Sequence, residues 1–183
     1  MTVSFPRPPV RLRHLSLGLA AQHTPAMAEF PARVEAIHIA ASVGEPMTAV
    51  DRVRAVAGGG LEGDRYARRA GRWSDDSRVD RDLTLVEAEV LEDLAATDGI
   101  ILAPGETRRN VTTRGVRLNE LVGRRFRVGD VECIGTRLCE PCQYLTDAVG
   151  QPILRPLVHR AGLRAKILTD GEIVIGGEIR AVD

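Results

Sequence analysis

The sequence predicts a mainly β domain with a few helices (an α+β fold) whose strands curl toward a barrel. Short segments in which apolar and polar residues alternate are typical of strands, and they recur along the chain. Glycine-containing turn signals join several of them in pairs. No regular alternation of strands with helices and no internal repeat is present, which argues against a doubly wound α/β fold.

The strands are predicted in chain order. Residues 34–43 and 50–56 form the first two, separated by a break at Gly44-Glu45-Pro46. Gly129-Asp130 lies between apolar residues 125–128 and 131–134 and predicts a hairpin. A closing hairpin is expected from residues 165–168 and 173–175 across Asp170-Gly171, and residues 179–182 would add a last strand.

Four helical segments are predicted between the strands. Thr84 and Glu87 have the spacing of a capping box, and the apolar residues that follow recur at helical spacing, so we expect a helix over residues 85–96. One helical turn is expected over residues 118–121 and a short helix over 143–149. Pro152 could open a further helix, which Gly162 would stop.

Length and composition indicate one globular domain. The chain has 183 residues, of which 44% are hydrophobic and 27% charged. Its 25 basic and 25 acidic residues balance to a net charge of +0, so we expect neither general nucleic-acid binding nor membrane-surface binding. Residues 1–31 are proline-rich without a steady period, and we interpret them as a poorly ordered extension before a domain at 32–183. Whether residues 1–26 belong to the mature protein is left open.

The three cysteines carry the clearest chemical signal. Their odd number indicates reduced thiols and a cytoplasmic location rather than a disulfide framework. Cys133 lies within a strand pattern, where packing is the default. Cys139-Glu140-Pro141-Cys142 lies just before the predicted helix at 143–149, so Cys142 would face the unpaired N–H groups of its first turn, which favour a thiolate.

Several interpretations of these thiols stay open on spacing alone. Cys142 could be one functional thiolate with Cys139 as its neighbour or resolving thiol, or the pair could act as a dithiol oxidoreductase. A non-catalytic module is a third interpretation, in which Cys133, Cys139, Cys142 and His159 bind zinc or the cysteines merely pack.

Two further features point to a small anionic ligand. A glycine-rich loop at 57–64 matches neither a P-loop nor a dinucleotide fingerprint, yet it would allow close approach of backbone to a ligand. Arginine is suited to bidentate phosphate binding. It is frequent in one stretch of the sequence: Arg108, Arg109, Arg114, Arg117, Arg124, Arg125, Arg127 and Arg137.

From about Val34 to Val182 the chain resembles stand-alone proteins of the MOSC family, named after the C-terminal domain of molybdenum cofactor sulfurase. The order and coverage of the matching segments carry the resemblance. These segments are Gly60-Leu61-Glu62-Gly63-Asp64-Arg65-Tyr66, Leu83-Thr84-Leu85-Val86, Arg108-Arg109-Asn110, residues 121–129, Cys139-Glu140-Pro141-Cys142, and Gly162-Leu163-Arg164-Ala165 with Gly171 and Gly176.

The resemblance implies a MOSC-type β-barrel-like fold and a role in molybdenum-cofactor or sulfur chemistry. It implies that Cys142 carries sulfane sulfur or ligates molybdenum in molybdopterin. It further implies that Arg108, Arg109 and Asn110 hold the pterin phosphate, and that Gly63, Asp64 and Arg65 shape the pocket. The sequence resembles neither a desulfurase nor a flavin or iron–sulfur domain. We therefore expect pyridoxal phosphate only through a separate cysteine desulfurase, or electrons from a separate donor protein, with the chain acting as a sulfurtransferase-like protein or a reductase component.

Overall fold

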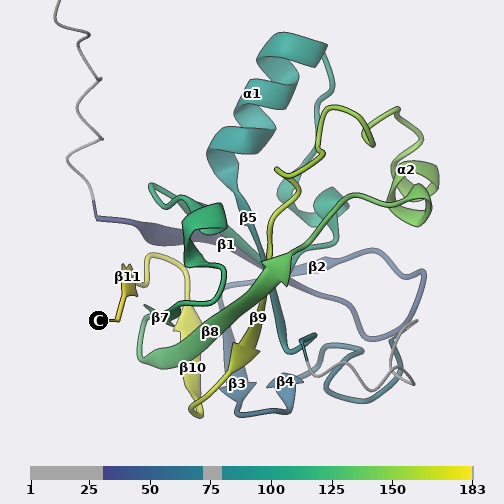
Figure 1. Ribbon diagram of the computed structural model, residues 1–183. Helices are drawn as coiled ribbons and strands as arrows, with labels where there is room; N and C mark the ends of the chain where they lie inside the picture. Colours follow the sequence, from purple (N-terminus) through teal and green to yellow (C-terminus); the bar gives the residue numbers. More distant parts are fainter. Residues whose placement is uncertain (1–30, 72–79, 183) are drawn as a thin grey trace, which may run out of the picture.

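The computed structural model describes residues 31–71 and 80–182. These residues form one large curled sheet and one small sheet, with helical segments gathered at one end (Figure 1). Of the predicted extension, residues 1–30 lie outside the described part of the chain. The domain boundary at residue 32 therefore stays a prediction.

The large sheet has eight strands in the order β11-β7-β8-β9-β5-β6-β1-β2 and curls into a half-barrel. All neighbours pair antiparallel except β5 and β6, which are parallel. The strands are β1 (Arg33–Ile39), β2 (Thr48–Val50), β5 (Leu83–Glu87), β6 (Val111–Arg114), β7 (Arg125–Val128), β8 (Val131–Leu138), β9 (Leu163–Ile167) and β11 (Ile179–Ala181).

The small sheet closes the core from the other side. Its strands pair antiparallel in the order β10-β3-β4, and they are β3 (Arg52–Val56), β4 (Gly60–Leu61) and β10 (Gly171–Val174). In β3, and in β8 as far as Gly135, every second residue is buried, as expected for strands with one face on the core. Val53 and Ile173 of the small sheet pack in the same apolar cluster as Phe126 and Leu163 of the large one.

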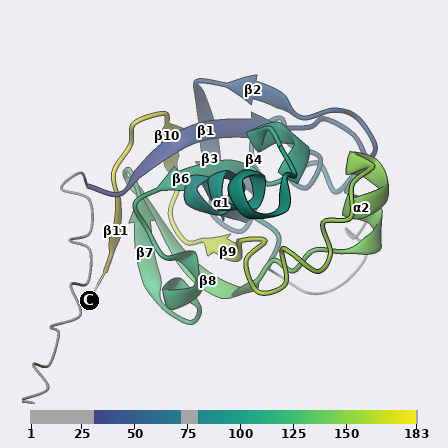
Figure 2. The same ribbon diagram turned by 90° about the horizontal axis from the view of Figure 1, so that it is seen from above.

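The helical segments are α1 (Ala88–Asp98), α2 (Gln143–Val149) and the 3-10 turns η1 (Pro104–Thr107) and η2 (Leu118–Leu121). Figures 1 and 2 both place α2 on the side of the molecule away from the C-terminus. A second apolar cluster lies beneath α2, in which Leu145 packs with Leu94 of α1 and with Ile153 and Leu157. This small core holds α2 and the segment before it in a fixed position.

The helix predicted over residues 85–96 is wrong at its start. Residues Leu83–Glu87 form β5, and α1 begins only at Ala88, with Glu87 as its N-cap residue. The capping-box pattern is local, whereas β5 is hydrogen-bonded to β6 on one side and β9 on the other. Thr84 uses its hydroxyl to donate to Asn110 Oδ1 at 2.8 Å rather than to cap a helix.

Four other predicted elements differ from the structure. The first strand, predicted over residues 34–43, ends at Ile39. Residues 50–56 do not form one strand, because β2 ends at Val50 and β3 starts at Arg52 in the other sheet. The predicted closing hairpin is not a pair, since β9 joins β8 and β5 whereas β10 joins β3. The segment after Pro152 forms turns instead of a helix. The 125–134 hairpin, the turn at 118–121, the helix at 143–149 and the strand near 179–182 are confirmed.

Candidate functional site

The C-x-x-C segment links β8 to α2, and its two thiols differ in exposure. Cys142 is the N-cap residue of α2, with an extended backbone (φ −143°), and its side chain is exposed. Cys139 is only 1% exposed, and Cys133 within β8 is 0% exposed. Burial, together with the nearby carboxylates of Asp82 and Glu132, raises the pKa of Cys133 to about 12. Of the three thiols, only Cys142 is open to a reaction partner.

A buried arginine fixes the backbone of this segment. The Arg109 guanidinium donates from Nε to Ala161 O at 2.9 Å, from one terminal nitrogen to Thr107 O at 3.2 Å, and from the other to Cys139 O at 2.9 Å. The Cys139 N–H in turn donates to Gly162 O at 2.7 Å. Arg109 therefore ties the start of the motif to the segment that follows Pro152.

A second contact holds the middle of the motif. Glu140 accepts a hydrogen bond from the His159 backbone N–H at 2.8 Å, and its other oxygen lies 2.7 Å from His159 Nδ1. Burial alone would raise the pKa of Glu140, but these contacts with His159 outweigh burial and lower it. His159 has a φ of 60°, a conformation that costs a non-glycine residue about 1 kcal/mol or more. The surrounding contacts hold it there.

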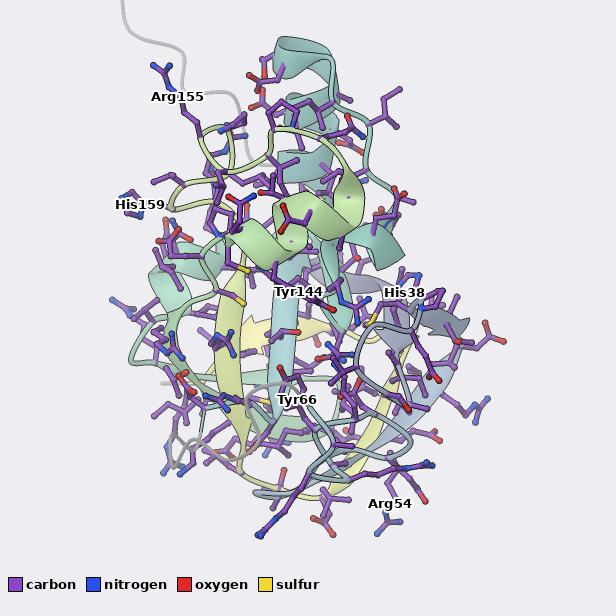
Figure 3. The ribbon with its side chains drawn as sticks, turned by 90° about the vertical axis from the view of Figure 1, so that its right-hand side faces the viewer. His38, Arg54, Tyr66, Tyr144, Arg155 and His159 are labelled. Carbon is purple, nitrogen blue, oxygen red and sulfur yellow. The ribbon has the colours of Figure 1, made fainter. Side chains whose placement is uncertain are left out.

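Beside the exposed thiol lies a pocket of about 640 Å³, counting the part open to solvent. We call it the thiol pocket, and it is defined by Val43, Arg65, Tyr66, Thr84, Arg108, Arg109, Cys139, Glu140, Cys142, Tyr144, Leu145 and Arg164. Four of these residues are arginines and one is acidic. Both tyrosines of the chain belong to the set, and Figure 3 shows Tyr144 beneath α2 with Tyr66 further down the same face.

Positive charge predominates in the thiol pocket, which favours the binding of an anion. The Arg65 guanidinium lies 5.0 Å from the Tyr66 ring centroid, and that of Arg108 lies 6.0 Å from the Tyr144 ring. Burial, followed by the nearby charge of Arg65, lowers the pKa of Arg108. Arg164 Nε is buried without a hydrogen-bond partner among the described residues. An anionic ligand would offset the repulsion between the arginines and accept hydrogen bonds from them.

A buried polar network stands behind the pocket. Asp64 Oδ2 accepts hydrogen bonds from Ala40 N at 3.2 Å, Arg65 at 3.4 Å and Asn110 Nδ2 at 3.2 Å. Asn110 also accepts from Thr84 and donates to His38 O. Gly63 has a φ of 83°, which favours glycine, and it places Asp64 in this network. The network orients Arg65 toward the thiol pocket.

Residues 54–180 match the model of the MOSC domain. The chain belongs to the MOSC family. The family is associated in general with molybdenum-cofactor sulfur chemistry. No curated protein matches the chain significantly in sequence.

Solved structures support the MOSC fold. The YuaD protein from Bacillus subtilis superposes with a TM-score of 0.69 at 19% identity, covering 83% of this chain and 96% of that protein. YiiM from Geobacillus stearothermophilus gives a TM-score of 0.63 at 17% identity, covering 84% and 76%. YiiM from Escherichia coli gives 0.59 at 19% identity, covering 82% and 70%. At these identities the likeness shows the fold alone, and it agrees with the barrel-like architecture expected from the sequence.

The predicted site residues of this MOSC chain fall into two groups. Lining the thiol pocket are Cys142, Cys139, Arg65, Arg108 and Arg109. Gly63, Asp64 and Asn110 lie behind it and hold its walls. The sequence analysis assigned Asn110 to the pterin phosphate and Gly63 and Asp64 to shaping the pocket. The contacts described here give Asn110 a bracing position, and every assignment of a role stays a prediction.

Three polar pocket residues were not predicted as site residues: Tyr144, which was not named at all, and Tyr66 and Arg164, which were named only within matched segments. A signal for the tyrosines was present, because the chain has only two tyrosines and 3% aromatic residues, and both flank predicted motifs. Arg164 lies in the matched segment before the closing strands, but nothing in its spacing distinguishes it from the other arginines.

The geometry disfavours the two alternative interpretations of the thiols. Among residues 31–71 and 80–182, no three His, Cys, Asp or Glu side chains come together as a metal site, and Cys133 is packed in the barrel core. A dithiol oxidoreductase would use Cys139 as the more reactive thiol, yet Cys139 is buried and Cys142 is exposed. No helix in the described part of the chain is long and apolar enough to cross a membrane.

Proposed function

We propose that the thiol pocket binds the phosphate-bearing molybdenum cofactor or receives sulfane sulfur, with Cys142 as the reactive group in either case. The observation that carries this proposal is the position of the one exposed cysteine at a pocket lined by four arginines. A soft thiolate ligand and an anion-binding wall are the two features that a molybdenum pterin phosphate requires.

The residues present fit such a group. Three arginines of the pocket would hold the phosphate: Arg65, Arg108 and Arg164. Arg164 Nε is buried without a hydrogen-bond partner among the described residues. The charges of Arg65 and Arg108 lie close enough to repel each other, and an anion between them would offset that repulsion. Arg109 already donates to three carbonyls, so its contribution is to position the motif. Cys142 would be the metal ligand. When bound, the molybdenum supplies two-electron redox chemistry to substrates.

In the sulfur-carrier form, the chemistry belongs to the chain's own residues. The Cys142 thiolate attacks the outer sulfur of a donor persulfide, R–S–SH. The donor S–S bond breaks as the Cys142 S–S bond forms, and the donor leaves as a thiolate, so no net oxidation occurs. The arginines that line the same pocket would attract an anionic donor to Cys142. The donor would be a cysteine desulfurase with its own pyridoxal phosphate.

The two roles require different partners. Sulfur carriage requires the desulfurase, whereas a molybdenum-dependent reductase component requires an electron-donor protein. The free state of all three cysteines fits the reducing conditions of the cytoplasm, where both kinds of partner would be met.

Bound metal and bound sulfur distinguish the two roles. The protein is produced in a molybdenum-replete, cofactor-competent host, and molybdenum and pterin are measured for the wild type, Cys142→Ser and Gln143→Ser. The control replaces the exposed neighbour, which lines neither the pocket nor the core. Near-stoichiometric molybdenum that only Cys142→Ser abolishes supports the cofactor role. A persulfide trapped on Cys142 in both the wild type and Gln143→Ser supports sulfur carriage.

One result contradicts the proposal. If Cys142→Ser leaves both molybdenum content and persulfide formation at the level of Gln143→Ser, Cys142 has neither role.

A further inference from the structure

A second pocket lies on the other side of Arg108. It measures about 1080 Å³, counting the part open to solvent, and Arg108 is the one described residue that lines both this pocket and the thiol pocket. Its walls come from β1, the β1–β2 loop, η1 and the C-terminal end of α2. The two pockets are therefore neighbours that share the Arg108 side chain.

The wall of the second pocket is mostly apolar and small. Pro46, Met47, Pro104, Ala148 and Val149 supply apolar surface, and glycine and alanine leave the remaining space open. Gly105 packs so closely on His38 that an added Cβ would lie 2.9 Å from the ring carbon Cδ2. The histidine ring, labelled in Figure 3, is thus fixed as part of the pocket wall.

Two side chains of this wall have unused hydrogen-bonding groups among the described residues: Arg108, and His38, whose buried Nδ1 has no partner there. Burial lowers the pKa of His38, so its ring is neutral near pH 7. The Glu106 carboxylate already accepts a hydrogen bond from Ala103 N at 2.7 Å. Arg108 is the cation of this wall, and with residues 31–71 and 80–182 its five N–H donors make one hydrogen bond, from a terminal nitrogen to Glu45 O at 2.9 Å.

The same loop forms part of both pockets. Val43 lines the thiol pocket, whereas Gly44, Pro46 and Met47 line the second one. This loop is tied to both arginines, because Glu45 O accepts from Arg108 and the Met47 sulfur accepts from Arg65 at 3.4 Å. A molecule in the second pocket would thus contact the elements that hold the arginines of the thiol pocket.

We infer that the second pocket binds the small-molecule substrate of the Cys142 site: a compact organic molecule that is not a cation, with an apolar body and one hydrogen-bond-accepting end that meets Arg108. This inference rests on the proposed function, since it supplies the substrate class for that site. The apolar wall accommodates the body, and the guanidinium favours a carbonyl or similar acceptor while it repels a cation.

The experiment uses two ring compounds of the same shape. Cyclohexanone carries an acceptor oxygen, and cyclohexylammonium carries a positive charge; binding of each to the full chain is measured by ligand-observed NMR titration. Ala148→Phe fills the pocket from an exposed position on α2. Asp147→Phe adds the same ring to the neighbouring exposed position, which lines neither pocket.

We expect Ala148→Phe to weaken cyclohexanone binding at least about tenfold and Asp147→Phe to leave it unchanged. Cyclohexylammonium should bind the wild type at least about tenfold more weakly than cyclohexanone does. Ala49→Phe, on β2, should reproduce the loss and replaces Ala148→Phe if that variant does not fold. Binding of inorganic phosphate, followed by ³¹P line broadening, should be the same in the wild type and Ala148→Phe.

Any of three results would overturn the inference. The first is unchanged ketone binding in Ala148→Phe, and the second is equal binding of the ketone and the ammonium ion to the wild type. The third is loss of both phosphate and ketone binding in Ala148→Phe, which would make the two pockets one ligand site. Failure of the proposed function is a separate result. It would appear as molybdenum content and persulfide formation independent of Cys142, with these binding constants unaffected.

Discussion

Replacing Arg109 by methionine should destabilise the protein far more than the same change at Arg108. Arg109 is 8% exposed and donates to three backbone carbonyls, two of which belong to the segments on either side of α2. A hydrogen bond from a charged group contributes about 1.5–3 kcal/mol, and a buried carbonyl without a partner is costly. Three such bonds, with some replacement by water, give a loss of roughly 3–6 kcal/mol in the free energy of unfolding.

Arg108 is the matched control, because it is the adjacent arginine and is more exposed. Its side chain makes one bond to the exposed Glu45 carbonyl, so Arg108→Met should change the free energy of unfolding by about 1 kcal/mol or less. Urea unfolding followed by circular dichroism measures both variants. If Arg109→Met lies within about 1 kcal/mol of the wild type, Arg109 does not hold the cysteine motif as described.

Two further predictions concern single positions. Native protein treated with iodoacetamide should be alkylated at Cys142, because only this cysteine is exposed, and Cys139 and Cys133 should react only after unfolding. Mass spectrometry of the peptides shows the order of labelling. Early labelling of Cys139 would contradict the assignment. Gly162→Ala should prevent folding or cost several kcal/mol, since the added Cβ would lie 1.9 Å from Leu85 O at a φ of 117°. Gly123→Ala, with φ 77° and open space around it, should cost only about 1 kcal/mol when both variants are measured by urea unfolding, and equal losses would show that the close approach at Gly162 is unimportant.

Local patterns predicted the elements whose pairing is also local. The Gly129-Asp130 turn joins strands that pair directly with each other, and Pro141 precedes a helix with the predicted bounds 143–149. Long-range pairing decided the failures. Leu83–Glu87 carries a helix-start pattern, yet it lies between two partner strands distant in sequence, and Ile173 pairs with Val53 rather than with the strand just before it.

The candidate site shows the same division. Spacing identified the exposed thiol and two adjacent arginines, but not that Arg109 turns inward to carbonyls while Arg108 lines the pocket. Arg108 has a φ of 57°, and this left-handed residue reverses the direction of the chain between the two side chains. A sequence pattern of two arginines contains no information on that backbone conformation, so the residue types were predictable and the division of roles was not.

Asp80 and Asp82 should respond to pH with opposite signs. Burial opposes ionisation of Asp80, but its hydrogen bond and ion pair with Arg137, with Arg164 and Arg81 adding positive charge, outweigh burial and lower its pKa. Burial raises the pKa of Asp82, more than the Ile167 N–H and Lys166 lower it. A lowered folded pKa gives stability that is present above the ordinary pKa of 3.8 and is lost as the pH falls through the folded value. A raised one means that the folded protein binds the proton more tightly, so stability is gained as the pH falls from the folded value toward 3.8.

Substitution by asparagine removes each titration and leaves the side-chain shape nearly unchanged. Urea unfolding is measured at several pH values from neutral to about pH 3 for the wild type, Asp80→Asn and Asp82→Asn. Relative to the wild type, Asp80→Asn should become less destabilising as the pH falls, because the wild type itself loses the Arg137 pair. Asp82→Asn should become more destabilising, because the wild type no longer buries a charge. Parallel pH dependence of the two variants would show that local burial and the Arg137 pair do not control the pKa values of these carboxyls. Asp80 and Asp82 are two positions apart on the same segment, and these two features of their environments are what distinguishes them.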